Sequence, residues 1–117
     1  MNYLLVFTGG GIGSLARYGF GLLFSRMALQ LPYATLCANV VSCILFSGLI
    51  YAYETRQAIP ENYRLFVLVG ICGGLSTFST FSFETFEMIR QQLYGWAVAN
   101  VLLSLVLCTS VLFLFSK

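Results

Sequence analysis

The sequence contains no histidine, and only 9% of its 117 residues are charged. Histidine is the commonest metal ligand and the only side chain whose unperturbed pKa lies near neutral pH. Its absence argues against an enzyme, because the serine and cysteine residues have no histidine base. Six Lys and Arg against four Asp and Glu, without a basic run, also argue against a nucleic-acid partner.

The cysteines lack the spacing of a metal or disulfide framework. No CxxC pair occurs among the four, which lie inside apolar stretches at Cys37, Cys43, Cys72 and Cys108. We interpret them as small apolar packing residues. The N-terminus has no basic region of the kind that opens a secretory signal, so we expect the first apolar segment to stay in the mature protein.

Apolar residues are what the sequence has in abundance. They make up 59% of the chain, and the mean hydropathy is +0.88. Spans of roughly 20 residues would fit about four times into this length, and a backbone in lipid must satisfy its own hydrogen bonds. We therefore expect a single all-α transmembrane domain covering residues 1–117. Its four predicted transmembrane helices are at about 3–24, 33–52, 63–89 and 94–116.

The positive charges are balanced between the two sides of this topology. Four spans place both termini and the 53–62 connector on one side, and three Lys or Arg residues fall on each side: Arg56, Arg64 and Lys117 against Arg17, Arg26 and Arg90. Because Lys and Arg imbalance sets orientation, this count predicts insertion in both directions. The alternative is a weakly biased protein oriented by another signal. Insertion in both directions favours an antiparallel dual-topology dimer with its axis in the membrane plane.

The densest polar signal lies at the middle of the third span. Gly73-Gly74 followed by Ser76-Thr77 favours a helix break, and irregular backbone at that depth is tolerated only inside protein or facing a cavity. Freed carbonyls there could bind a cation. The alternative is a flexible kink whose hydroxyls bond back to carbonyls one turn earlier.

Two phenylalanines follow the predicted break. Phe78 and Phe81 are spaced i, i+3 and share a helix face. Phenylalanines in a membrane usually pack or face lipid. These, however, alternate with the hydroxyl donors Ser79, Thr80 and Ser82, and aromatic ring edges carry positive potential. Such a lining would suit an anion.

Other polar residues in apolar segments have two interpretations each. Asn39 either links two helices by hydrogen bonds or serves as an amide donor for a small dehydrated anion. Arg17, the only cation within an apolar segment, either serves function or snorkels to the interface. Near the end of the third span, Glu84 lies closer to the serine-rich face, and we expect Glu87 to pair with Arg90.

Small and hydroxyl residues elsewhere carry less information. Residues 9–13, with four glycines, resemble a nucleotide-binding loop only superficially, since no strand precedes them and no P-loop lysine follows. We interpret them as a site of close helix packing. Hydroxyls of the fourth span are ambiguous because they often bond to backbone carbonyls: Ser104, Thr109 and Ser110.

Three segments together resemble the Fluc fluoride channel family, also called CrcB. Residues 10–18 are similar to its GGxG(A/S)xxR(Y/F) pattern, residues 35–39 to its TLxxN and residues 73–84 to its GGxTTFSTFSxE. The match covers almost the whole chain. Departures are mild: Ala34 and Ser42 stand where glycine is common, and Ser76 where threonine is usual.

The resemblance implies an antiparallel homodimer in the inner membrane, with two pores for passive fluoride efflux that relieves fluoride toxicity. Its motifs assign the pore to Asn39, Phe78, Ser79, Thr80, Phe81, Ser82 and Glu84, with Arg17 near a vestibule. They also imply a structural sodium ion at the dimer interface, held by the main-chain carbonyls of Gly73 and Ser76.

Two other functions fit the size and hydropathy of the chain. A dual-topology multidrug exporter would need a membrane-embedded carboxylate, typically in the first span, whereas the first carboxylate here is Glu54 in a connector. A non-transporting assembly subunit of a membrane complex would not need a hydroxyl and phenylalanine track beside a helix break. The near-equal charge count favours a homodimer over a heterodimer with a paralogue.

Overall fold

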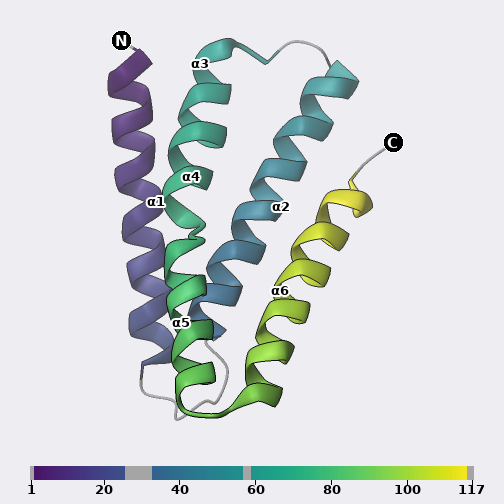
Figure 1. The fold of residues 1–117 in the computed structure, drawn as a ribbon. Coiled ribbons are helices and arrows are strands. Elements are labelled where there is room, and N and C mark those ends of the chain that lie inside the picture. The colour runs from purple at the N-terminus through teal and green to yellow at the C-terminus, as the bar shows by residue number, and fades with distance from the viewer. Residues whose placement is uncertain (1, 26–32, 57–58, 116–117) are drawn as a thin grey trace.

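The computed structural model describes residues 2–25, 33–56 and 59–115. This described part of the chain is helical and contains no strand, which confirms the all-α class (Figure 1). Its elements are α1 (Asn2–Phe24), α2 (Tyr33–Arg56), α3 (Glu61–Arg64), η1 (Leu65–Cys72), α4 (Gly73–Leu75), α5 (Ser79–Arg90) and α6 (Tyr94–Leu114). The predicted third span comprises α3, η1, α4 and α5.

Three stretches among the described residues are long and apolar enough to cross a membrane: Tyr33–Thr55, Glu61–Arg90 and Tyr94–Leu114. They match the second, third and fourth predicted spans, although residue 116 lies outside the described residues. The chain is therefore a multi-pass membrane protein. With 23 residues, or about 34 Å at the helical rise, α1 is also long enough to span. Its glycines and Arg17 lower its hydropathy, and it is not one of the three.

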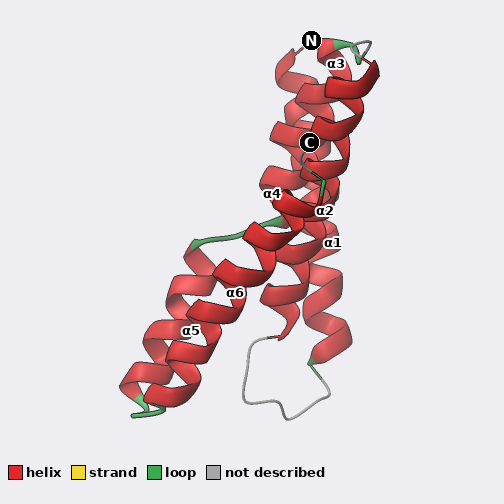
Figure 2. Cartoon of the chain, turned by 90° about the vertical axis from the view of Figure 1, so that its right-hand side faces the viewer, coloured by secondary structure: helices red, strands yellow, loops and turns green. Residues whose placement is uncertain are grey.

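The third helix bends, and its two halves pack on different neighbours. η1 and α4 pack on α1, whereas α5 packs on α6, and α6 returns to α2. Figure 2 shows α5 and α6 leaning together away from α1 and α4. The start of α1 and the end of α6 lie toward the same end of the bundle as α3 (Figure 1), as the predicted topology requires. The bend thus opens the bundle near its middle.

Glycines let α1 approach the third helix at backbone distance. A Cβ atom on Gly13 would overlap the carbonyl oxygen of Ile71, and one on Gly74 would overlap that of Gly10. A Cβ on Gly70 would lie 2.8 Å from the Cα of Gly9. These contacts confirm that the first glycine cluster serves close helix packing.

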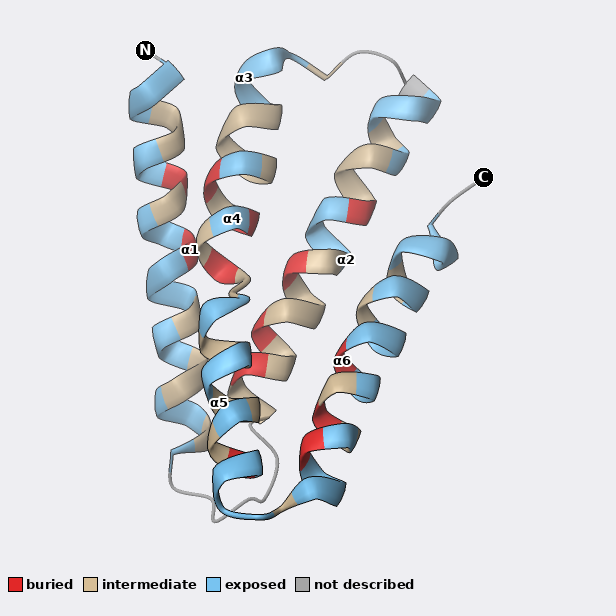
Figure 3. Ribbon diagram, viewed as in Figure 1, coloured by how far each residue is buried: buried red, intermediate tan, exposed pale blue. Residues whose placement is uncertain are grey.

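Most buried residues are small or polar, with Leu75 and Met88 as large apolar exceptions, and many large apolar residues are exposed. Figure 3 shows that exposed residues cover much of the helix surface. The buried polar residues lie where helices face one another: Thr35, Ser42, Ser47, Asn100 and Ser104. In water this arrangement would expose a large apolar surface. In a bilayer it places the apolar side chains against lipid or a partner and leaves the small residues to pack helices together.

The break in the third helix begins at Ser76, within the segment 73–77 that predicts it, and the two glycines before it stay helical. Gly73 is still helical, with φ −64° and ψ −37°, whereas Ser76 is extended, with φ −80° and ψ 154°. Gly74 is needed for contact with α1, so the glycines stay in the helix and the chain departs after Leu75. Upstream, residues 65–72 form a π-helix, a rare conformation that the sequence did not indicate.

Candidate functional site

Asn39 of α2 replaces the helical hydrogen bonds that the break removes. Its Oδ1 accepts the backbone N–H of Thr77 at 2.8 Å, and its Nδ2 donates to the Thr77 carbonyl at 3.4 Å. Both polar groups of an irregular residue at membrane depth are thereby satisfied. Asn39 therefore links two helices by hydrogen bonds, which is one of its two predicted roles, and its partner is backbone rather than a side chain.

Two serines converge on one carbonyl just before the break. The Cys72 carbonyl accepts the hydroxyl of Ser42 from α2 at 3.0 Å and that of Ser76 from its own helix at 2.7 Å. Ser76 therefore bonds back one turn, as the kink interpretation expects. The Ser42 bond ties α2 to the helix immediately before the chain becomes extended.

Thr77 supports the start of α5 from one residue before the N-cap residue Phe78. Its hydroxyl oxygen accepts the backbone N–H of Thr80 at 3.2 Å and lies 3.4 Å from the Ser79 hydroxyl. Side-chain oxygens at this position satisfy N–H groups that have no partner in the helix. Thr77 therefore holds both sides of the break: its backbone pairs with Asn39, and its side chain starts α5.

Arg17 reaches the break from α1. Its Nε donates to the carbonyl of Gly74 at 3.1 Å, and the residue is half-buried. A cation next to the last carbonyls of a helix is favourable because the helix dipole is negative there. The structure thus places Arg17 against the end of α4 rather than in an exposed interfacial position.

A cavity of about 270 Å³ lies at the break and is lined by residues of α2, α5, α6 and the linker before α5. It brings together four of the predicted site residues: Asn39, Ser76, Phe78 and Phe81. The two rings have centroids 5.8 Å apart and are tilted by 45°. Phe78 is 78% exposed in the single chain, so one edge of the cavity is open.

The other predicted pore residues do not line this cavity. Ser79, Thr80, Ser82 and Glu84 lie beside it or further along α5. Glu84 Oε2 accepts the Thr35 hydroxyl at 2.9 Å, while its Oε1 is buried without a hydrogen-bond partner. The polar groups on this helix therefore extend well beyond the cavity.

Helix α6 contributes residues to the cavity that its sequence left ambiguous. Ser104 and Thr109 line it, and the Ser104 hydroxyl is buried with no hydrogen-bond partner. Asn100, only 2% exposed, donates to the Thr85 hydroxyl at 2.9 Å and joins α6 to α5. Asn100, Ser104 and Cys108 recur every four residues. That spacing was the available signal for a polar face.

At the far end of α5, Glu87 and Arg90 form the predicted ion pair. Arg90 Nε lies 2.9 Å from Glu87 Oε1. Arg64 stands at the opposite end of the bent helix, with its guanidinium 5.0 Å from the centre of the Tyr53 ring. Arg26 and Lys117 lie outside the described residues, so the predicted charge balance stays a prediction.

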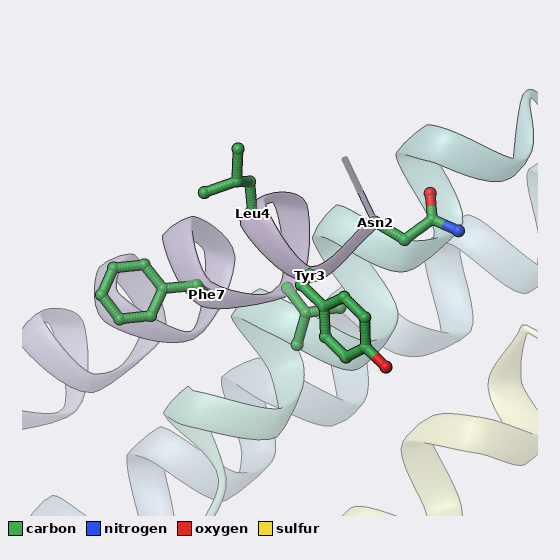
Figure 4. A pocket seen from close by; sticks show the side chains of 5 residues that line it. Asn2, Tyr3, Leu4 and Phe7 are labelled. Atoms are coloured by element: carbon green, nitrogen blue, oxygen red, sulfur yellow. The ribbon is translucent and has the colours of Figure 1, made fainter.

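A second hollow lies on the first turns of α1, and it is apolar. Figure 4 shows Tyr3, Leu4 and Phe7 projecting outward from that helix. Phe7 is 78% exposed. No predicted site residue takes part, so this hollow belongs to the outer apolar surface.

Comparison with known proteins identifies the class. The sequence matches the family described as "CrcB-like protein, Camphor Resistance (CrcB)" over residues 4–115. It is 42% identical over 110 residues to a protein of Coxiella burnetii named "Fluoride-specific ion channel FluC", covering 92% of this chain and 89% of the relative. Proteins with the same name from Rhodospirillum rubrum and Methylobacterium radiotolerans are each 38% identical, covering 86% and 75% of those relatives. The chain belongs to the CrcB family.

Proposed function

We propose that the protein is a fluoride-selective channel that allows passive fluoride efflux across the bacterial inner membrane and so relieves fluoride toxicity. The observation that carries the proposal is the cavity at the helix break, where Asn39, Phe78 and Phe81 come together. The family supports it, because the curated relatives are named as fluoride-specific channels.

The cavity offers neutral donors to a small anion. Fluoride is strongly hydrated, so a pore must replace its water with closely spaced hydrogen-bond donors and positive ring edges. Ser104 has a hydroxyl with no hydrogen-bond partner among the described residues, and Phe78 and Phe81 have ring edges of positive potential. No charged residue of the described chain lines the cavity. Binding therefore stays weak enough for the ion to leave.

Beyond the cavity, we propose that the pathway continues along α5. Ser79, Thr80 and Ser82 would offer hydroxyls, and Glu84 would stand toward the far end. Arg17 would attract anions electrostatically at a vestibule rather than bind them, since its Nε already donates to the Gly74 carbonyl. A positive charge at that distance attracts anions without binding them in the narrow part of the pore.

The active unit in this proposal is an antiparallel dual-topology homodimer of four-span chains with two pores. Balanced positive charge in the sequence supports insertion in both directions. The exposed edge of the cavity at Phe78 and the open surface at Gly73 support a partner that covers the break.

A structural sodium ion at the centre of this dimer fits the residues present. Hard cations prefer oxygen ligands, and Gly73 and Ser76 would each offer a main-chain carbonyl. The Thr77 N–H, which would serve the Gly73 carbonyl in a regular helix, donates to Asn39 instead. The end of a half-helix is also negative and suits a cation. Two carbonyls from each chain would hold the ion.

Fluoride efflux from liposomes tests this function. Purified protein is reconstituted, and fluoride release is followed with an electrode beside chloride release and protein-free vesicles. We expect rapid fluoride release without chloride release. A dimeric sample prepared in sodium that releases neither ion would overturn the proposal and favour an assembly subunit.

A further inference from the structure

Two cysteines from different helices face the same cavity. Cys43 of α2 and Cys108 of α6 both line it. Both are free and half-buried. Of the other two cysteines, Cys72 is tied to Ser42 by hydrogen bonds in both directions, and Cys37 does not line the cavity. Cys43 and Cys108 are therefore the two cysteines that share this cavity.

A third group in the same place has no partner. Ser104 precedes Cys108 by one turn of α6 and lines the same cavity. It is only 8% exposed, and its hydroxyl has no hydrogen-bond partner among residues 2–25, 33–56 and 59–115. Buried polar atoms of this kind normally interact with something. The region around the thiol pair thus has unused capacity to bind a ligand.

We propose that Cys43 and Cys108 form a binding site for a soft divalent metal ion that takes two ligands in a linear arrangement, as Hg²⁺ does. Thiolates select soft metals. On binding, two S–H bonds break, two metal–sulfur bonds form, and two protons leave to water. The bis-thiolate of a divalent ion is neutral, which matters because an uncompensated charge is costly in an apolar cavity.

The same chemistry excludes harder and four-coordinate ions. Zinc in proteins is held by four ligands, or by three and a water. The described residues contain no group of three or more His, Cys, Asp and Glu that could supply them. The pair therefore discriminates by coordination number and binds Hg²⁺ in strong preference to Zn²⁺.

Metal at this site would stand beside the two phenylalanine rings. Phe78 and Phe81 line the same cavity as both thiols, so a bound ion would occupy space that the pathway needs. Loss of flux on metal binding rests on the proposed function, whereas binding itself does not. The two are measured separately.

Binding is tested first, on the full-length protein in detergent. HgCl₂ is titrated while mercury–thiolate absorption is followed, and the remaining thiols are counted with a thiol reagent after denaturation. We expect one tight Hg²⁺ per chain that protects two thiols, loss of this site in Cys43→Ser and in Cys108→Ser, and its retention in Cys37→Ser. Tight Hg²⁺ binding in the Cys43→Ser and Cys108→Ser variants equal to that of the unmodified protein would overturn the proposal.

Flux is tested second, in liposomes. HgCl₂ is expected to abolish most fluoride release by the unmodified protein and by Cys37→Ser, and excess dithiothreitol is expected to restore it. ZnCl₂ at the same concentration is expected to have no effect. Inhibition that persists in both Cys43→Ser and Cys108→Ser would place the block elsewhere. If the protein releases no fluoride at all, the titration in detergent still decides whether the site exists.

Discussion

Asn39 holds Thr77 by both of its backbone groups, with the side-chain amide accepting the N–H at 2.8 Å and donating to the carbonyl at 3.4 Å. The two residues are 38 positions apart in the sequence. One side chain on α2 thus stands in for the hydrogen bonds that an unbroken third helix would have made itself. The conformation of the break depends on this pair.

Removing the amide is therefore expected to destabilise the protein. Asn39→Leu leaves two backbone groups without partners, at a cost of about 1–3 kcal/mol each. Thermal unfolding of the purified protein in detergent measures the effect. Asn39→Asp keeps an acceptor for the Thr77 N–H and should lose less. An Asn39→Leu protein as stable as the original would show that the break holds without this pair.

The contact between α1 and the third helix predicts opposite behaviour for two neighbouring glycines. In Gly13→Ala the new methyl group would overlap the Ile71 carbonyl, and the forced shift should cost about 1–3 kcal/mol. Gly11→Ala is the matched control, because a Cβ there meets nothing within 4 Å. It should be neutral or slightly stabilising. Equal melting temperatures for the two variants would contradict the packing described for α1.

Ser104 separates a role in transport from a role in stability. Its hydroxyl has no hydrogen-bond partner in the part of the chain that the structure describes, so Ser104→Ala removes no hydrogen bond seen there and should leave the melting temperature unchanged or raise it. Fluoride release should nevertheless fall, because the cavity loses a donor. Ser110→Ala, on the exposed side of α6, should change neither. Normal release by Ser104→Ala would remove this hydroxyl from the pathway.

Two phenylalanine pairs with the same spacing occur on the third helix, and only one lines the cavity. Phe81→Ile should strongly reduce fluoride release because it removes a ring edge from the pathway. Phe86→Ile is the comparison. The rings of Phe86 and Phe83 also pair, with centroids 6.4 Å apart, but neither residue lines the cavity. Liposome efflux, with gel filtration to verify assembly, measures both. If the two variants conduct alike, the ring edges of the cavity are dispensable.

Gly73 tests the proposed sodium site and the dimer together. A Cβ on Gly73 meets nothing within 4 Å of the single chain, so Gly73→Val disturbs no contact described within it. The valine should instead hinder a partner at the break and lower the dimer fraction, measured by cross-linking at several protein concentrations. Gly95→Val, also open in the single chain, serves as control. An intact dimer with unchanged sodium occupancy would argue against a site at Gly73.

Much of the fold was predictable because the chain must satisfy its backbone in lipid. The long apolar runs marked the helices to within a few residues: α2 extends to Arg56 rather than 52, and α6 begins at the predicted Tyr94. The cluster of glycines in residues 9–13 indicated close packing, and Glu87 and Arg90 indicated an ion pair. Each of these features depends on neighbours in the sequence or on composition.

The break was harder to predict because its cause lies on another helix. Gly73 and Gly74 suggested conformational freedom, yet Gly74 is held helical by contact with α1. The chain leaves the helix at Ser76, next to Thr77, whose backbone N–H donates to Asn39. The Ser104 hydroxyl was ambiguous for a similar reason: whether it bonds locally or lines a cavity depends on which residues α6 meets.

The contact between Arg17 and Gly74 spans 57 positions, which has a consequence for biosynthesis. The ribosome delivers α1 first, with its guanidinium and its row of glycines, well before the carbonyl and the helix surface that receive them. Until η1 and α4 emerge, this segment lacks its hydrogen-bond partner and its main packing surface, and only α2 is available to pack against. Chains truncated before Gly74 should therefore retain α1 poorly in the bilayer, and completion of the third helix is the step that secures the N-terminal segment.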